Sequence, residues 1–185
     1  REQKLREAQE IGKMGHWELD LQSDELVWSD QVYRIFNVDP ETFILSPSAF
    51  LETLHPEDRD IARNLYADSV ENKTDYDIKI RIVLENGDVR HIHDRCKTEY
   101  AEDGTALRSI GTLQDITEEV RNEGVMSVRA KLAEFSLNHS LTEVLRKTLD
   151  EAEELTQSTI GFYHFIDENQ KGAFHLLKMG SFGIV

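Results

Sequence analysis

Residues 76–116 alternate between apolar and polar side chains around two tight turns, and this pattern constrains the fold more than any other feature. Apolar side chains occupy every second position at Tyr76, Ile78, Ile80, Ile82 and Leu84. A period of two places these side chains on one face of a strand. Asn86-Gly87 is the most favoured two-residue hairpin turn, so residues 89–100 must return antiparallel. Glu102-Asp103-Gly104 marks a second turn, and residues 106–116 complete a three-stranded meander.

A shorter hairpin and a helix begin the chain's first domain. Apolar and polar residues alternate over residues 16–22, and residues 25–28 return as a second strand. Ser29 takes the N-cap position of the next helix, and Asn37, which tolerates positive φ, ends it. The expected buried face of this helix comprises Val32, Ile35 and Phe36.

Two further helices precede the meander. Residues 47–54 form a short one, and His55-Pro56-Glu57-Asp58-Arg59 predicts the start of a longer one, with Pro at its first position and acids in its first turn. Ile61 and Leu65 are expected to form the buried edge of the longer helix. Two strands, several short helices and three strands, in that order, predict an α+β domain with helices on one face of an antiparallel sheet.

The charge balance argues against two classes of partner. The chain has 185 residues, with 21 basic and 36 acidic side chains, and a net charge of −15. Nucleic acids and anionic membrane surfaces attract proteins through an excess of Lys and Arg. We therefore expect no nucleic-acid partner and no direct membrane contact.

Cys96 is the single cysteine of the chain. It cannot form an internal disulfide or supply a thiolate zinc cluster alone, so we infer a reducing compartment. No apolar run approaches the ~20 residues that span a bilayer, and residues 1–10 are charged rather than signal-like. These observations predict a cytoplasmic location.

Amphipathic helices are expected on both sides of this domain. Residues 1–15 form a linker helix whose apolar stripe includes Leu5 and Ile11. Gly124 interrupts the apolar pattern of the second linker helix, over residues 119–138, and is a candidate hinge. The stripe beyond this glycine has the spacing of the a/d seam of a two-stranded coiled coil, and it consists of Val125, Val128, Leu132 and Phe135. We expect a homodimer through both flanking helices.

Several short motifs occur in the order found in a known family. They are Trp17-Glu18-Leu19-Asp20-Leu21, Trp28-Ser29, Tyr33-Arg34-Ile35-Phe36, His55-Pro56-Glu57-Asp58-Arg59, Asn86-Gly87-Asp88, Asp103-Gly104, Gly111 and Asp115-Ile116-Thr117-Glu118. Over residues 16–118 the chain resembles a PAS sensor domain, in particular the subgroup common in bacterial sensor kinases. The resemblance implies a five-stranded antiparallel sheet that cups a small cavity beneath its helices. It also implies signal transfer through the Asp-Ile-Thr junction into the following helix.

The residues of this junction provide a mechanism for the transfer. Asp115 can accept hydrogen bonds from free amide groups at the helix start, and Glu118 completes an acidic variant of a capping box. A shift of the last strand would change a cap worth ~1 kcal/mol and so bias the helix. We expect Asp115, Thr117 and Glu118 to transmit the signal, and the alternative is an ordinary cap with no signalling role.

Residues 139–185 resemble the start of a GAF domain. The resemblance rests on Leu149-Asp150-Glu151-Ala152 and Ile160-Gly161-Phe162-Tyr163-His164-Phe165-Ile166-Asp167. It implies that only the beginning of such a domain is present, because residues 172–185 depart from the family pattern. A lone helix and strand bury no core of their own, so we expect this tail to be disordered or packed on a neighbour.

Other residues with reactive side chains are expected to have structural roles. His91 and His93 share one face of a strand, but no third metal ligand accompanies them, so no metal site is expected. Cys96 is expected to be a buried small hydrophobe. His139 lacks the adjacent acid and downstream Pro of the histidine-kinase phosphorylation motif. The chain has no Gly-x-Ser-x-Gly elbow or phosphate-binding loop, and we expect no catalytic residue in it.

No cofactor is expected from the resemblance. The flavin-binding branch of the PAS family carries its reactive Cys in a helical motif that is missing here. The haem-binding branch uses a His in the long helix, and residues 57–72 contain none. Trp17 and Trp28 either stack on a planar ligand or, as we expect, anchor the core or a dimer. The sequence allows a small-molecule ligand but does not identify it.

These features predict a sensory and dimerisation module of a multidomain bacterial signalling protein. The expected parent is a sensor histidine kinase, with a diguanylate cyclase or phosphodiesterase as the alternative. A second hypothesis, from a different class, is a protein-interaction spacer whose cavity is filled by its own side chains.

Overall fold

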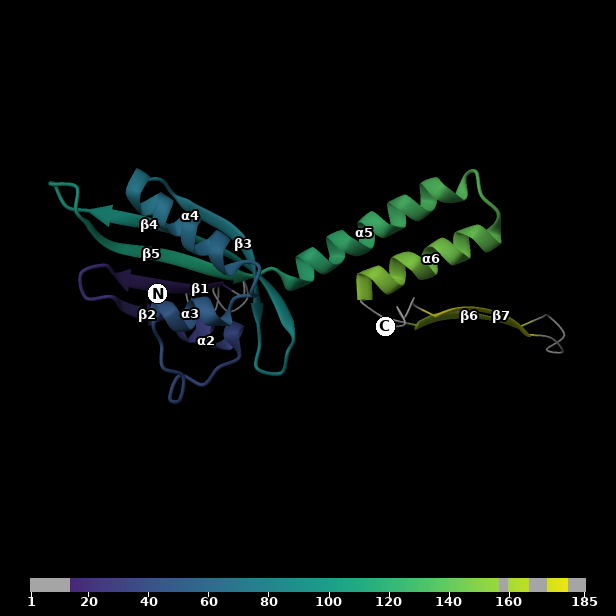
Figure 1. The fold of residues 1–185 in the computed structure, drawn as a ribbon, viewed down its shortest axis with the longest axis horizontal. Helices are drawn as coiled ribbons and strands as arrows, with labels where there is room; N and C mark the ends of the chain where they lie inside the picture. The colour runs from purple at the N-terminus through teal and green to yellow at the C-terminus, as the bar shows by residue number, and fades with distance from the viewer. Residues whose placement is uncertain (1–13, 157–159, 167–172, 180–185) are drawn as a thin grey trace, which may run out of the picture. The chain divides into compact units, whose positions relative to one another are not determined.

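The computed structural model describes residues 14–156, 160–166 and 173–179 (Figure 1). The chain divides into two compact units, Arg1–Glu118 and Glu119–Val185, and each is described by itself. The predicted linker helix over residues 1–15, with Leu5 and Ile11, lies almost entirely outside the described residues, and only Met14 and Gly15 of it are described. These two residues belong to a strand.

The first unit contains the five-stranded antiparallel sheet. Its strands are β1 (Met14–Asp20), β2 (Glu25–Trp28), β3 (Tyr76–Val83), β4 (Val89–Tyr100) and β5 (Ala106–Asp115). They lie in the order β2-β1-β5-β4-β3, so the first hairpin pairs with the last strand of the meander. The α+β architecture predicted from the alternating pattern is confirmed.

The two turns of the meander are hairpins, as predicted, but each loop contains three residues rather than two. In the first, the Leu84 N–H donates to the Asp88 carbonyl and the Gly87 N–H donates to the Leu84 carbonyl, each at 2.8 Å. Gly87 has a φ of 86° and Gly104, in the second turn, a φ of 88°. A loop of this kind needs one left-handed residue at its third position, and glycine adopts that conformation without steric cost.

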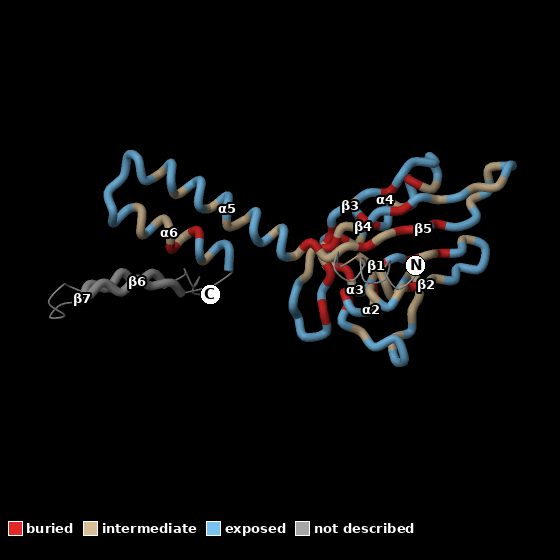
Figure 2. The backbone as a smooth tube through the Cα atoms, turned by 180° about the vertical axis from the view of Figure 1, so that it is seen from behind, coloured by how far each residue is buried: buried red, intermediate tan, exposed pale blue. Residues whose placement is uncertain are grey.

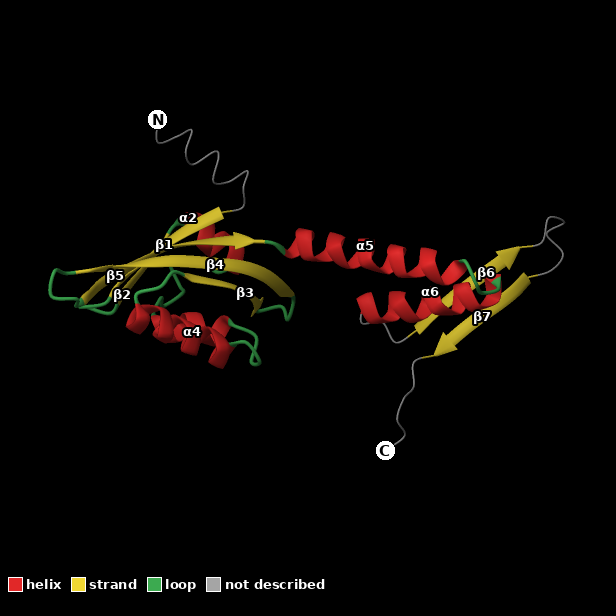
Figure 3. Ribbon diagram, turned by 90° about the horizontal axis from the view of Figure 1, so that it is seen from above, coloured by secondary structure: helices red, strands yellow, loops and turns green. Residues whose placement is uncertain are grey.

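Three short helices pack on one face of this sheet. They are α2 (Asp30–Phe36), α3 (Pro47–Thr53) and α4 (Arg59–Asn72). Val32, Ile35 and Phe36 are buried, and Asn37 ends α2 in a left-handed conformation, as predicted. Ser29 lies at the N-cap position, but its hydroxyl accepts from the His16 N–H at 3.0 Å instead of capping the helix. Figure 3 shows α4 lying along the sheet.

The prediction for α4 was wrong in two respects. The helix begins at Arg59, because Pro56 lies in a preceding turn. Ile61 and Leu65 are 61% and 38% exposed, whereas Ala62 and Ser69 are buried. The helix therefore presents the stripe of Ala62, Tyr66 and Ser69 to the sheet. The two larger aliphatic side chains suggested a different face, but the helix turns its small residues Ala62 and Ser69 inward.

The core lies between the helices and the sheet, as the red segments of Figure 2 show. Trp28 is its aromatic centre, and its ring lies 4.6 Å from that of Phe36 and 5.6 Å from that of Phe43, centroid to centroid.

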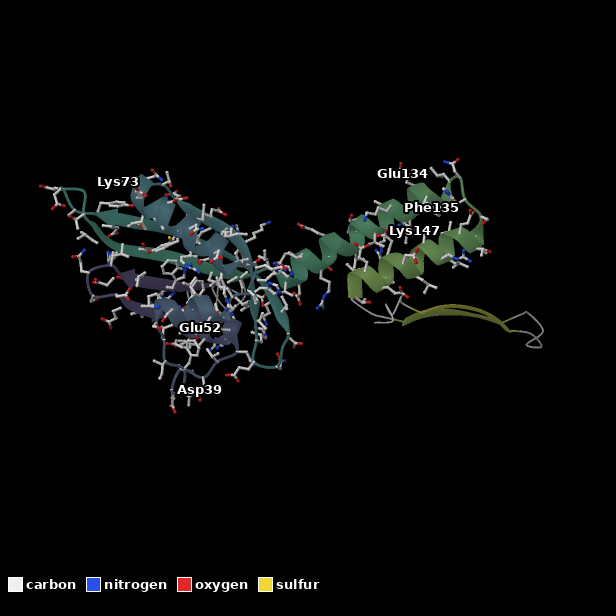
Figure 4. The ribbon with its side chains drawn as sticks, in the orientation of Figure 1. Asp39, Glu52, Lys73, Glu134, Phe135 and Lys147 are labelled. Atoms are coloured by element: carbon white, nitrogen blue, oxygen red, sulfur yellow. The ribbon has the colours of Figure 1, made fainter. Side chains whose placement is uncertain are left out.

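Trp17 crosses the neighbouring strand over Gly111, where an added Cβ would lie 2.3 Å from the indole. Both tryptophans are therefore core residues, as expected. Lys73, labelled in Figure 4, lies at the C-terminal end of α4, and its ammonium group lies over the Tyr100 ring.

The second unit begins with two helices and continues into a β-hairpin. Its elements are α5 (Thr117–Ser136), whose first two residues belong to the first unit, α6 (Leu141–Thr156), β6 (Ile160–Ile166) and β7 (Ala173–Met179). Ser140 and Glu143 form a reciprocal capping box at the start of α6. The sequence did not predict β7, which pairs with β6. In the described part of the chain, no helix is long and apolar enough to cross a membrane.

Gly124 does not interrupt α5, which is helical from end to end. The predicted seam residues Val125, Val128, Leu132 and Phe135 are each half-buried. Helix α6 runs alongside (Figures 1 and 3), and the Lys131 ammonium lies 3.3 Å from the Glu151 carboxylate. A Cβ at Gly124 would lie 3.0 Å from Leu155. The glycine therefore permits close helix packing here, and the predicted hinge is not observed.

We expect Gly111→Ala to lower the free energy of unfolding by about 2 kcal/mol, because the new methyl group must displace the Trp17 indole. Denaturant unfolding would measure the loss of stability, and near-ultraviolet circular dichroism would detect the displaced indole. Gly87→Ala is the control: it should cost about 1 kcal/mol through its positive φ and leave the indole signal unchanged. Wild-type stability and indole signal in Gly111→Ala would contradict the packing described here.

Candidate functional site

A cavity of about 110 Å³ lies between the sheet and the helices α3 and α4. Its walls are mainly aromatic and aliphatic. The lining residues are Trp17, Leu19, Leu26, Trp28, Pro47, Phe50, Leu51, Ala62, Arg63, Tyr66, Tyr76, Asp94 and Leu113. Ala62, where α4 approaches the sheet, leaves room that a larger side chain would fill. The cavity that the family resemblance implied is therefore present, and both tryptophans line it.

Asp94 is the carboxylate in this lining, and it is only 2% exposed. Its Oδ1 accepts a hydrogen bond of 2.8 Å from the Trp17 Nε1–H. The two residues belong to β1 and β4, with β5 between them. The bond therefore spans the central strand, and Gly111 is the residue over which the indole passes.

Burial governs the acid–base chemistry of these side chains. Desolvation raises the pKa of Asp94 to about 7, although the bond from Trp17 favours the charged form. Burial also raises the pKa of Cys96 to about 12 and that of the Tyr76 hydroxyl above its usual range. Cys96 is thus a buried thiol, as expected, and Asp94 is the group near the cavity that titrates around neutrality.

A second polar link connects α4 to the sheet. The hydroxyls of Tyr66 and Ser109 lie 2.8 Å apart, and Ser109 makes an equal contact with Thr98. Tyr66 lines the cavity, whereas Ser109 and Thr98 belong to β5 and β4. The cavity wall on α4 is therefore connected to the two strands that lead to the junction.

At the junction after β5, Asp115 and Thr117 bond as the sequence predicted for Asp115. The Asp115 Oδ1 accepts from the Thr117 N–H at 2.9 Å and from the Thr117 hydroxyl at 2.6 Å. The Thr117 Oγ1 also accepts from the His91 N–H at 3.0 Å, and the Ile116 N–H donates to the His91 carbonyl at 2.9 Å. Thr117, the first residue of α5, is thus hydrogen-bonded to β4. Glu118 is exposed on the first turn of the helix.

Arg90 is a junction residue that sequence reasoning missed. Its Nη1 donates to the Ile35 carbonyl at 2.7 Å and lies 3.9 Å from the Asp115 Oδ2. The Ile35 carbonyl belongs to the last turn of α2, where a cation is favoured by the helix dipole. Arg90 therefore links the C-terminal end of α2 to the junction. The sequence could have indicated this position, because Arg90 lies two residues before Ile92 on β4 and therefore on the same, inward-facing side of the strand.

The motif before α4 anchors the loop to the sheet edge instead of starting the helix. The Asp58 carboxylate accepts from the Arg81 backbone N–H at 2.8 Å and from its guanidinium at 2.6 Å. The Arg81 guanidinium lowers the pKa of Asp58. Arg59 donates to the carbonyls of Leu54 and Glu52. These bonds fix α3 and α4, which form one side of the cavity, against β3.

The candidate metal ligands His91 and His93 make contacts within the sheet and at the junction. His93 Nε2 contacts the Asp77 carboxylate at 2.7 Å. The His91 backbone N–H donates to the Thr117 hydroxyl at the junction. No cluster of three or more His, Cys, Asp or Glu side chains among the described residues is arranged to hold a metal ion. His139 lies in the turn before α6 and stacks on Phe135 with ring centroids 3.6 Å apart.

Asp94 makes the stability of the first unit depend on pH. Its pKa is raised in the folded state from an ordinary value of 3.8, so the folded protein binds the proton more tightly than the unfolded chain. The contribution of Asp94 to stability is therefore greatest below pH 4 and falls as the pH rises from about 4 to about 7, by at most ~1.4 kcal/mol per unit. Asp94→Asn should remove this slope. Urea unfolding of both proteins between pH 4 and pH 8 measures it, and parallel curves would contradict the assignment.

The sequence matches the family model described as PAS fold over residues 25–113. It is 26% identical over 128 residues to the probable diguanylate cyclase DgcE of Escherichia coli, and 28% identical over 138 residues to the methyl sulfide methyltransferase-associated sensor of Methanosarcina acetivorans. These matches cover 68% and 74% of this chain but only 11% and 14% of the two relatives. The chain therefore spans a small part of the curated relatives it matches.

Solved structures show the same fold. A sensory box histidine kinase/response regulator from Burkholderia thailandensis is similar with a TM-score of 0.59 and 21% identity, over 71% of this chain and 98% of that one. The five-stranded antiparallel sheet, the helices on one face and the family match over residues 25–113 agree with one another. The first unit therefore has the PAS fold.

Proposed function

We propose that this PAS-fold unit binds a small molecule in its cavity and relays binding through the Asp115–Thr117 junction to α5. One observation carries the proposal: Leu113 lines the cavity, and Asp115 lies two residues further along β5 on the same face. A ligand that displaces Leu113 therefore acts on the strand segment whose next inward-facing side chain caps α5. Packed strands transmit such shifts because they deform little internally.

A second route reaches the same junction through α2. Phe36, in the last turn of α2, packs against Trp28, which lines the cavity. The carbonyls of that turn hold Arg90, and Arg90 lies beside Asp115. A ligand that moves Trp28 would change the position of this guanidinium. The two routes converge on one carboxylate, which supports a role for Asp115 in transmission rather than in capping alone.

For the parent protein we propose a multidomain bacterial sensor histidine kinase, with a diguanylate cyclase as the alternative. Relatives of both kinds are similar to this chain, which supports a sensor role without favouring either output. A cytoplasmic homodimer through the flanking helices, and a GAF domain that begins within residues 139–185, remain part of this proposal. The competing function is a spacer whose cavity binds nothing.

Native mass spectrometry and thermal unfolding of the purified chain test the sensing function. A ligand that binds only the folded state must raise the melting temperature as its concentration rises. We expect either a retained small molecule or a stabilising compound in a fragment screen. Ala62→Phe, which fills the cavity, should remove that response while the circular dichroism spectrum stays that of a folded protein. An equal response in Ala62→Phe would place binding elsewhere, and no binder at all would favour the spacer.

The relay predicts that Asp115→Ala loosens the first turn of α5. Loss of a cap worth about 1 kcal/mol should reduce hydrogen-exchange protection roughly fivefold at residues 120–123, whose amides make the first hydrogen bonds within the helix. Asp103→Ala is a matched control, because the Asp103 Oδ1 accepts from the Thr105 N–H at the same 2.9 Å in a turn far from α5. The control should leave protection of α5 unchanged. Equal protection in Asp115→Ala and wild type would refute the relay.

A further inference from the structure

We infer that the cavity selects a small organic amine, bound as its ammonium with Asp94 as counter-ion and the aromatic rings as walls. The inference rests on the proposed function, since it specifies the ligand of the same cavity. It begins from the juxtaposition of one deeply buried carboxylate with Trp17, Trp28, Tyr66 and Tyr76 in a single lining.

The Asp94 carboxylate is incompletely compensated by the protein. A buried carboxylate is normally paired with a cation or with several hydrogen-bond donors. Within the described residues, the influences on Asp94 are burial, the Trp17 indole N–H and the Arg95 backbone, and none of them is a cation. Desolvation outweighs both hydrogen bonds, which is why the pKa of Asp94 rises to about 7. An ammonium group in the cavity would supply the missing positive charge.

The aromatic walls favour the same class of ligand. The faces of indole and phenol rings attract cations, and the indole of Trp does so more strongly than the rings of Tyr and Phe. The rings of Tyr66 and Tyr76 lie edge to face, with their centroids 5.8 Å apart, and both residues line the cavity. The net charge of −15 also attracts cations in preference to anions.

Volume limits the ligand to a few atoms. A cavity of about 110 Å³ holds roughly four or five non-hydrogen atoms, since a dry cavity of ~150 Å³ accepts benzene. Butylamine, with its apolar chain and terminal ammonium, has the appropriate size and chemistry. 1-Butanol is its neutral counterpart, and propionate is an anion with the same number of non-hydrogen atoms.

Arg63 is the group in the lining that argues for an anion instead. Its guanidinium forms an ion pair of 2.7 Å with Asp60, and its side chain is 58% exposed. Its charge is therefore partly neutralised and screened by solvent, whereas Asp94 is desolvated. We thus place the recognition of charge at Asp94, and the propionate arm of the experiment tests Arg63.

The test is a titration of the purified chain with the three compounds at pH 8, where Asp94 is mostly ionised and butylamine is protonated. Thermal unfolding and the ¹⁵N signal of the Trp17 indole report binding. We expect butylamine to bind at least tenfold more tightly than 1-butanol, and Asp94→Asn to abolish this preference. Asp60→Asn removes a carboxylate at the exposed pair and should leave the preference intact.

A second measurement covers the case in which Asp94→Asn does not fold. In the wild-type chain, butylamine affinity should rise about tenfold between pH 6 and pH 8 as Asp94 ionises, while 1-butanol affinity stays constant. A pH-independent affinity, or preference for 1-butanol or propionate, would overturn the amine inference and leave the sensing cavity standing. Failure of all three compounds would also overturn it, and the broader fragment screen would then decide separately on the proposed function.

Discussion

The hydrogen bond from the Trp17 indole to Asp94 is the interaction on which the architecture of the first unit depends. It joins β1 to β4 across β5, and it requires Gly111 beneath the indole. The same bond places a large ring and a carboxylate in the lining of the cavity. A buried polar pair of this kind is costly unless it is satisfied, so it specifies one arrangement of the three strands. The sheet and the cavity thus share one structural determinant.

The parts of the fold that could be predicted are those governed by local pattern. Period-two alternation predicted the strands, and glycine in tight turns predicted both hairpins, because these signals depend on neighbouring residues alone. The buried face of α4 could not be predicted from aliphatic content, since the residues that the helix buries are the small Ala62 and Ser69. The number of residues in each loop was also missed, because a two-residue and a three-residue hairpin share the same glycine signal.

The candidate site divides in the same way. Asp115 was predictable because a cap acts within a few residues of its own position. Arg90 and Asp94 were not, since their partners Ile35 and Trp17 are remote in sequence. The seam from Val125 to Phe135 shows a further limit of pattern. An apolar stripe must be covered, but the stripe alone does not distinguish a second copy of the chain from α6 of the same chain.

The contact between Trp17 and Gly111 has an evolutionary consequence. Any side chain larger than hydrogen at position 111 must displace an indole at position 17, so we expect the two sites not to vary independently. A related protein with a larger residue at position 111 must carry a smaller one at position 17. It then loses the indole N–H that donates to the carboxylate at position 94. Substitutions at these three positions should therefore be inherited together. Homologues would fall into two groups, one with an acid in its cavity wall and one without.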